Sequence, residues 1–293
     1  MVAHTEPLGA SMNAKILGSG PTTVVLAHGF GGDQSVWDKI VPSLVQSNCQ
    51  VLVFDWAFSG ATEAVPSLYD PARHASYDGF ASDLVSLLEE MMVKSVVFVG
   101  HSMSGMIGCL ASIKRPQLFQ RLVLLCASPR YVNTDDFQGG FEDSDVEKLI
   151  SSMESDYAAW ATGFSGLVVD PNHPASADKF CKCLLLMRPE VAIPLAKTIF
   201  YSDHRDILGD VTVPCQIVHA TNDIVVPNSV ALYMQTHIGA GKSTLEMMEI
   251  DGHFPQMTAP GQLIAVLRSL LPGASGGLAV GHIGAGARCA VEL

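Results

Sequence analysis

Short apolar runs recur along this chain and alternate with segments of helical periodicity. Each run has the length of a strand, and most lack a polar face, which is typical of parallel strands covered by helices on both sides. The runs cover Val24–Ala27, Val51–Phe54, Val96–Val99, Leu122–Ala127, Cys215–Ala220 and Leu245–Ile250. This alternation predicts an α/β fold with a mostly parallel sheet and helices on both faces.

Amphipathic segments fill most of the gaps between these runs. Apolar residues recur at helical spacing in segments 35–45, 77–92, 103–113, 228–236 and 260–271. Strand-type runs are missing from residues 131–204, where only helical patterns occur. We expect helices there near 144, where Ser144 and Glu147 have the spacing of a capping box, and over 156–165, 175–187 and 189–201.

This pattern divides the chain into three parts. Residues 1–130 and 205–272 form the predicted core, residues 131–204 form a helical lid inserted into it, and residues 273–293 form a Gly- and Ala-rich tail that we expect to be flexible. A chain of 293 residues with 48% hydrophobic residues is long enough for one large core with such an insertion.

Charge and cysteine content exclude several kinds of partner. The formal net charge is −12, so nucleic acid and anionic membrane surfaces would be repelled. No run reaches the roughly 18 apolar residues of a membrane span, and we expect a soluble monomer. Seven cysteines, an odd number lying mostly in apolar runs, predict a reduced intracellular protein. Cys181 and Cys183 lack a second ligand pair, so we expect no metal and no cofactor.

The run Val96–Val99 ends in Gly100-His101-Ser102-Met103-Ser104-Gly105. A strand followed by Gly-x-Ser-x-small is typical of a nucleophile elbow, a sharp turn into a helix that exposes the Ser hydroxyl. The alternative is that Ser102 only caps the following helix. The choice between them depends on whether an acid and a base follow in the right places.

An acid and a base do follow in the order expected for this fold. Asp223 comes after the run Cys215–Ala220, and His253 comes after Leu245–Ile250, so both lie at carboxyl ends of predicted strands. The other candidates fit less well, because they lie inside a strand, in a helix, in the tail or before a strand: His219, His237, His282 and Asp210. We therefore predict a Ser102, Asp223 and His253 triad, in which His253 takes the Ser102 proton.

An oxyanion hole needs two backbone N–H groups beside the nucleophile. Met103 follows Ser102, and Phe30 lies in the Gly-rich segment after the first long strand, so these two are the candidate donors. Aromatic residues of the lid region are candidates for the ligand pocket, although some would serve only as lid core. They are Tyr131, Phe141, Trp160, Phe164, Phe180 and Phe200. Few basic residues lie near these motifs, which favours a small neutral ligand.

Several long motifs resemble the plant α/β hydrolases that perceive strigolactones and karrikins. They include Gly100–Gly108, Leu110–Pro116, Ala127–Tyr131, Gly139–Glu142, His28–Gly31, Asp33–Trp37 and Thr198–Asp203, within a match that spans residues 13–271. The resemblance implies the α/β-hydrolase fold, the same triad and oxyanion donors, and a four-helix lid over a butenolide pocket. It further implies slow hydrolysis coupled to a lid change that recruits an F-box protein and repressors, in the cytoplasm and nucleus.

The chain departs from that family at the elbow, where Met103 and Gly105 replace Val and Ala, and in segment 54–60. Leu185 also stands where Phe is common. These departures bear on ligand preference. The leading interpretation is a butenolide hormone receptor that slowly hydrolyses its ligand. The alternatives are a binding module, a metabolic esterase or lactonase without a signalling partner, and a stress-signalling hydrolase of the bacterial type, which Ser202–Arg205 also resembles.

Overall fold

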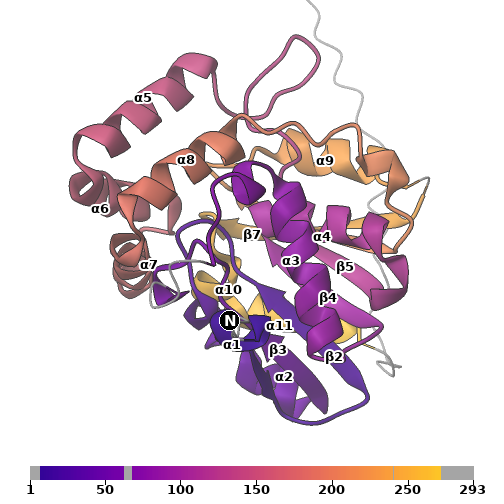
Figure 1. Cartoon of the computed structure of the whole chain (residues 1–293). Coiled ribbons are helices and arrows are strands. Elements are labelled where there is room, and N and C mark those ends of the chain that lie inside the picture. The colour runs from indigo at the N-terminus through magenta and orange to yellow at the C-terminus, as the bar shows by residue number, and fades with distance from the viewer. Residues whose placement is uncertain (1–6, 63–67, 240, 272–293) are drawn as a thin grey trace, which may run out of the picture.

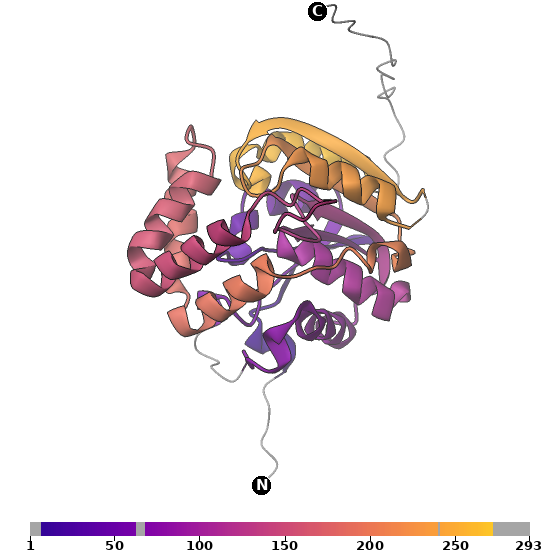
Figure 2. The same cartoon turned by 90° about the horizontal axis from the view of Figure 1, so that it is seen from above.

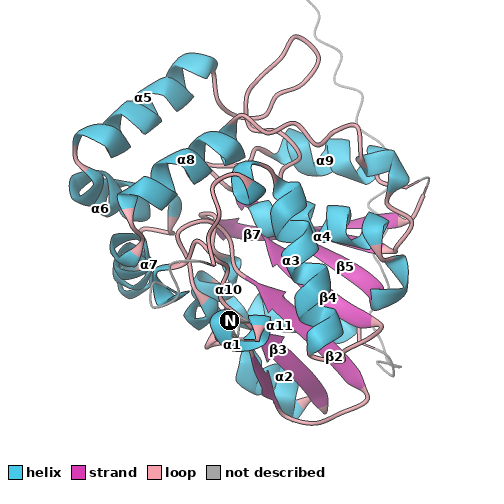
Figure 3. Ribbon diagram, viewed as in Figure 1, coloured by secondary structure: helices cyan, strands magenta, loops and turns pink. Residues whose placement is uncertain are grey.

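The computed structural model of the chain describes residues 7–62, 68–239 and 241–271. The tail that we expect to be flexible, residues 273–293, lies outside the described residues. Within them, seven strands form one sheet in the order β1-β3-β2-β4-β5-β6-β7 (Figure 3). The strands are β1 (Lys15–Leu17), β2 (Thr22–Ala27), β3 (Cys49–Val53), β4 (Val96–His101), β5 (Phe119–Leu125), β6 (Cys215–Asn222) and β7 (Ser243–Asp251).

All neighbouring strands of this sheet are parallel except β1 and β3, which are antiparallel. Every residue of β4 is buried, as expected for a central strand covered on both faces. The predicted α/β fold with a mostly parallel sheet is confirmed. The sequence patterns did not indicate β1, because its three residues are exposed and carry no apolar run.

Helices cover both faces of the sheet. The helix pair α3 and α4 packs in front of it in Figure 1, and α2 and α11 contact each other on the opposite face. The helices outside the lid are α1 (Leu8–Ser11), α2 (Val41–Gln46), α3 (Tyr77–Glu90), α4 (Met103–Lys114), α9 (Asn228–His237), α10 (Pro255–Thr258) and α11 (Pro260–Ser269). None of the helices in the described part of the chain combines the length and the apolar character needed to cross a membrane.

The segment predicted as one helix over residues 35–45 is two elements. A 3-10 helix covers Gln34–Trp37, and α2 begins only at Val41. Pro42 explains the break, because proline lacks an N–H and its ring clashes with the carbonyl four residues earlier. Proline is tolerated in the first turn of a helix, and Pro42 lies there in α2.

Four helices of the described segment 131–204 lie together beyond the carboxyl ends of the strands (Figures 1 and 2). They are α5 (Asp143–Ser155), α6 (Tyr157–Val168), α7 (Pro174–Leu186) and α8 (Pro189–Phe200). Helix α5 packs against α6 and α8, and α6 packs against α7. The cap of α5 is Glu142 rather than Ser144, and its backbone N–H donates to the Asp145 carboxylate at 3.4 Å.

The chain leaves and re-enters the core beside one ion pair. Arg130 precedes the lid helices and Asp203 follows them, and these two residues form an antiparallel β-bridge. The N–H of His204 donates to the carbonyl of Pro129 at 2.8 Å in the same place. The lid helices are therefore attached to the sheet by a short two-stranded base.

Candidate active site

Ser102 lies between the end of β4 and the start of α4 and has an unusual backbone. Its φ of 56° and ψ of −125° lie outside the conformations common for L-residues. Two glycines let the chain pack closely at this turn. A Cβ on Gly100 would lie 2.5 Å from the carbonyl oxygen of Ser104, and a Cβ on Gly105 would lie 2.5 Å from the Cβ of Ala127. The strained turn holds the Ser102 side chain at the carboxyl edge of the sheet.

The structure brings together the three residues predicted for the triad. The Nε2 atom of His253 lies 2.9 Å from Ser102 Oγ, and its Nδ1 atom lies 2.7 Å from Asp223 Oδ2. All three residues are buried. Asp223 comes from the loop after β6, and His253 comes from the loop after β7. Residues from three separate strand ends thus meet at one point, as expected for parallel strands.

The Asp223 carboxylate is held in its charged form. Burial alone would raise its pKa, but nearby His253 and hydrogen-bond donors lower the pKa below its usual value. Its Oδ1 accepts from the backbone N–H groups of Val225 at 2.8 Å and Val226 at 3.1 Å. A charged Asp223 accepts the Nδ1 proton of His253, which leaves Nε2 free to accept the Ser102 proton.

The two candidate oxyanion donors lie on segments that border Ser102. Met103 is the first residue of α4, and Phe30 belongs to the loop after β2. Neither of their N–H groups donates a hydrogen bond to another residue in the described ranges. A Cβ on Gly29 would lie 3.0 Å from the Cβ of Ser102, so the loop approaches the nucleophile closely. Both N–H groups are therefore free to bind a negatively charged oxygen.

Tyr131 adds a polar group beside the nucleophile. Its hydroxyl oxygen lies 3.5 Å from Ser102 Oγ, and the residue is buried. Burial raises the pKa of Tyr131 to about 12, so the hydroxyl stays protonated at physiological pH. Sequence patterns predicted Tyr131 as an aromatic wall of the pocket, whereas its hydroxyl also faces the reacting atoms.

A cavity with mostly apolar walls lies over Ser102 and His253. Its lining residues are Phe30, His101, Ser102, Tyr131, Phe164, Val168, Phe180, Ile199, Phe200, Val225, His253 and Phe254. Its volume is about 30 Å³, which is space for one or two water molecules. A ligand larger than this must displace some of the aromatic side chains. The walls favour a neutral ligand, because a charged one would lose its hydration without compensation.

Two residues predicted to line the pocket do not line this cavity. Trp160 stacks on Phe164 with ring centroids 5.0 Å apart, and Phe141 packs edge-on against Phe200 at 5.3 Å. Both therefore support wall residues from behind. Sequence reasoning missed Phe254 and Val225, although each lies within two residues of a predicted triad member. It also missed Val168 and Ile199, for which the helical pattern carried no signal.

His101 supports the catalytic loop rather than the chemistry. Its Nε2 donates to the backbone carbonyl of His253 at 2.8 Å. Burial and the neighbouring His253 lower the pKa of His101 to about 3, so the ring is neutral at physiological pH.

One cluster in the described ranges has metal-ligating side chains close together, formed by Cys126, Asp223 and His253. Since Asp223 and His253 already bind each other there, the geometry suits proton transfer better than a metal ion.

Comparisons with known proteins agree with this geometry. The chain matches the α/β hydrolase fold family over residues 22–171. It is 40% identical to a strigolactone esterase of Arabidopsis thaliana, with 89% of this chain and 97% of the relative covered. It is 45% identical to the karrikin insensitive 2 receptor CA of Petunia hybrida, with 87% and 93% covered.

A similar solved structure also supports the α/β-hydrolase fold. A hydrolase from Oleispira antarctica superposes with a TM-score of 0.84 at 32% identity, covering 89% of this chain and 94% of that one. The family resemblance expected from the motifs is confirmed. The chain is a hydrolase of the α/β-hydrolase family and belongs to the group that contains the strigolactone esterases and karrikin insensitive receptors.

Proposed function

We propose that this hydrolase is a butenolide receptor of the strigolactone or karrikin type, which binds a small neutral ligand and hydrolyses it slowly. The observation that carries the proposal is the position of Ser102 and His253 at the wall of an aromatic cavity lined by lid residues, with Asp223 bonded to His253 behind them. Relatives at 40–45% identity whose names include strigolactone esterase and karrikin insensitive receptor support this ligand class.

The first half of the reaction forms an acyl-enzyme. Ser102 Oγ attacks the carbonyl carbon of the ester or lactone, and the hydroxyl proton passes to His253 Nε2 over the 2.9 Å contact. Asp223 stabilises the resulting imidazolium through Nδ1. The carbonyl oxygen becomes negative and is bound by the N–H groups of Phe30 and Met103. The tetrahedral intermediate then expels the leaving oxygen, which takes the proton from His253.

The second half releases the acyl group. Water gives a proton to His253 and attacks the ester carbon on Ser102. The second tetrahedral intermediate then collapses to a carboxylic acid, and the departing Ser102 Oγ takes the proton back from His253. The small volume of the cavity supports slow turnover, because ligand entry and product release both require wall side chains to move. Phe30 on the core and Phe180 on α7 both line the cavity, so such movement involves the lid helices.

Signalling is the second part of the proposal. A monomeric receptor in the cytoplasm and nucleus would present its lid surface to an F-box protein and to repressor partners once the ligand is bound. The chain passes between core and lid helices at the short base of Arg130 and Asp203, and elsewhere the lid helices contact the core through hydrogen bonds such as Lys179 Nζ to Asp38 Oδ2 at 2.8 Å, which would have to break when they change position.

A panel of strigolactone-like and karrikin-like stereoisomers tests the proposal. We expect one ligand class to be hydrolysed slowly and to change the melting temperature, and Ser102→Ala to lower hydrolysis by about 10⁴-fold or more. Undiminished hydrolysis by Ser102→Ala would exclude the mechanism. A ligand-dependent pulldown of an F-box protein tests the signalling part, and its failure with every hydrolysed ligand would exclude that part.

The second candidate is a metabolic esterase or lactonase, which the similarity to the Oleispira antarctica hydrolase favours. It predicts rapid turnover of simple esters and no change of melting temperature with any butenolide. The same panel, measured beside a simple ester, therefore separates the two candidates.

A further inference from the structure

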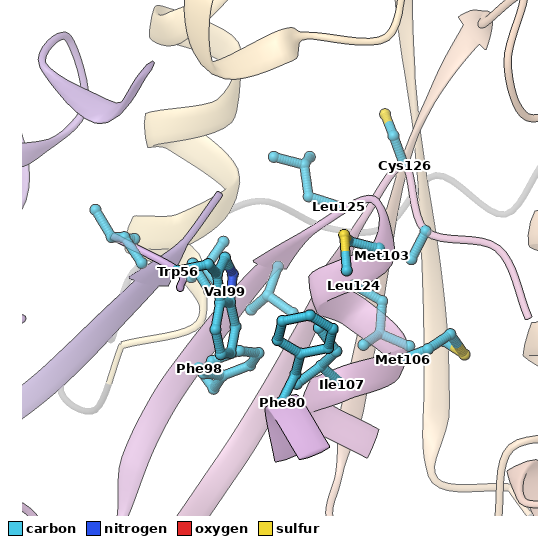
Figure 4. Close-up of a cluster of buried hydrophobic side chains, with 14 of the residues drawn as sticks. Trp56, Phe80, Phe98, Val99, Met103, Met106, Ile107, Leu124, Leu125 and Cys126 are labelled. Carbon is cyan, nitrogen blue, oxygen red and sulfur yellow. The ribbon is translucent and has the colours of Figure 1, made fainter. Parts of the chain in front are cut away.

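Trp56 lies in the segment after β3 and is fully buried. Its indole N–H points between two acceptors, with Nε1 3.0 Å from the carbonyl oxygen of His28 and 2.9 Å from Ser104 Oγ. Figure 4 shows its ring in the buried cluster near the start of α4, where Met103 also lies. The ring packs edge-on against Phe54 at 4.8 Å and Phe80 at 5.9 Å between centroids, which sets its orientation.

Further hydrogen bonds join the same residues into a closed network. Ser104 Oγ donates to the His28 carbonyl at 2.5 Å. The backbone N–H of Trp56 donates to His28 Nε2 at 3.1 Å, and His28 Nδ1 donates to the carbonyl of Gly29 at 2.9 Å. Burial lowers the pKa of His28, so the ring stays neutral, with one nitrogen as donor and the other as acceptor.

This network connects the two segments that carry the candidate oxyanion donors. Ser104 immediately follows Met103 on α4, and His28 precedes Phe30 by two residues on the loop after β2. The indole N–H is shared between the two segments and reinforces the direct hydrogen bond from Ser104 to the His28 carbonyl, so its loss would loosen the link between them. An oxyanion hole requires its two donors to hold a fixed separation before the negative charge develops.

We infer that Trp56 is a positioning residue for the oxyanion hole, which acts through Ser104 on Met103 and through His28 on Phe30. This inference rests on the proposed serine-hydrolase mechanism. Packing of the ring alone does not explain why the indole N–H of Trp56 has two hydrogen-bond acceptors. Trp37 is equally buried, and its Nε1 has no hydrogen-bond partner in the described part of the chain. Trp37 therefore provides a matched control for the loss of an indole at a buried site.

The test compares Trp56→Phe with Trp37→Phe and wild type, using hydrolysis of p-nitrophenyl acetate and phosphonylation by a p-nitrophenyl alkylphosphonate. Trp56→Phe keeps an aromatic ring and the backbone N–H but loses the indole donor. We expect its kcat to fall about tenfold with KM within about twofold, because positioning a donor matters in the transition state more than in the bound substrate. Phosphonylation, which also forms a tetrahedral centre, should slow by the same factor, and Trp37→Phe should retain wild-type rates.

Ser104→Ala serves as a second variant, because it removes one partner of the indole and the direct hydrogen bond to the His28 carbonyl while leaving Trp56 in place. We expect a fall in kcat of similar size, and an effect on top of Trp56→Phe that is less than additive. A folded Trp56→Phe with wild-type kcat would overturn the inference, and so would equal losses in Trp37→Phe. If Trp56→Phe does not fold, wild-type kcat in Ser104→Ala overturns it instead. Ser102→Ala is measured alongside, since activity retained in that variant would contradict the proposed function itself.

Discussion

Asp203 accepts a hydrogen bond from Arg130 Nη1 at 2.7 Å, which ties the chain together where the lid helices leave and rejoin the sheet. Asp203 also accepts from Arg205 Nε at 2.9 Å and Nη2 at 2.8 Å. One carboxylate therefore holds both sides of the lid base. Partial burial works against its charge, yet the hydrogen bonds from Arg205 and Arg130 lower the pKa of Asp203 to about 2.

We expect Asp203→Asn to lower the melting temperature at neutral pH by about 2–4 °C, because surface ion-pair networks contribute about 1 kcal/mol. The depressed pKa means that this stabilisation is complete above the unfolded value of 3.8 and is lost as the pH falls toward about 2. The difference in melting temperature between Asp203→Asn and wild type should therefore shrink below pH 3.8. Thermal melts from pH 7 downward measure it, with exposed Asp210→Asn as the control. A difference that is constant with pH would contradict the assignment.

Acid should destabilise the protein through its buried histidines. Burial lowers the pKa of four of them from the ordinary value of 6.5: His28, His101, His204 and His219. Below pH 6.5 the unfolded chain takes up protons at these side chains while the native state does not. The unfolded state then binds more protons, so the free energy of unfolding falls as the pH falls.

His219→Gln tests this linkage, since His219 is buried in β6 and donates to the carbonyl of Val226 at 3.0 Å, which glutamine can also do. We expect the slope of unfolding free energy against pH to decrease by up to about 1.4 kcal/mol per pH unit in the acidic range. Urea melts at several pH values measure the slope. The exposed His237→Gln is the control and should keep the wild-type slope. An unchanged slope in His219→Gln would refute the linkage.

Asp223→Asn should preserve the structure of the site and abolish most of the activity. An amide in place of the carboxylate no longer stabilises the His253 imidazolium and favours the wrong tautomer, and such a change costs about 10⁴-fold in kcat. Steady-state kinetics with an activated ester measure the effect. Asp251→Asn, an exposed carboxylate close to His253 in sequence, should stay near wild type. Substantial activity in Asp223→Asn would rule out this residue as the acid of the triad.

A methyl group at Gly105 should destabilise this chain, whose elbow packs around a glycine where the related hydrolases have alanine. A Cβ there would lie 2.5 Å from the Cβ of Ala127, and overpacking a tight interior costs about 1–3 kcal/mol. A Cβ on Gly163 of α6 would meet no described atom within 4 Å, so Gly163→Ala should raise stability by about 0.5–1 kcal/mol. Urea denaturation of both variants measures the contrast. Equal stability of Gly105→Ala and wild type would mean that the elbow relaxes freely.

Substituting a residue that lines the cavity should enlarge it, whereas substituting the residue packed behind it should not. Phe164 lines the cavity, and Trp160 stacks behind it at 5.0 Å. We expect Phe164→Ala to raise kcat/KM for a hexanoate ester relative to an acetate ester by about tenfold, since each accommodated methylene contributes about 1–3 kcal/mol. Trp160→Phe should keep the wild-type ratio. A larger change in Trp160→Phe than in Phe164→Ala would reverse the assignment of wall and support.

Sequence reasoning correctly predicted which residues meet where a local rule determines their place in the fold. Ser102, Asp223 and His253 follow apolar strands of a parallel sheet, so the ends of those strands had to meet at one edge. The break at Pro42 followed a known rule for proline but was hidden by helical spacing on either side of it.

The pocket and the support of the oxyanion hole were harder to predict. Phe141 and Trp160 are aromatic and lie in the lid region like the true wall residues, but residue type does not reveal which way a side chain points after packing. The role of Trp56 depends on contacts with residues 28 and 48 positions away, and no local motif encodes such contacts. The orientation of a side chain and its contacts with residues distant in sequence are decided only when the core has assembled.

The order of the elements also affects when the protein becomes active during synthesis. Strands β5 and β6 pair directly, yet all of the lid helices lie between them in sequence, and His253 is 151 residues from Ser102. Such non-local pairing is slow to form, and chains fold progressively as they leave the ribosome. A nascent chain that already contains the elbow therefore has no base for Ser102. The triad can form only when β7 and the loop after it have joined the sheet, so incomplete chains lack the base of the triad.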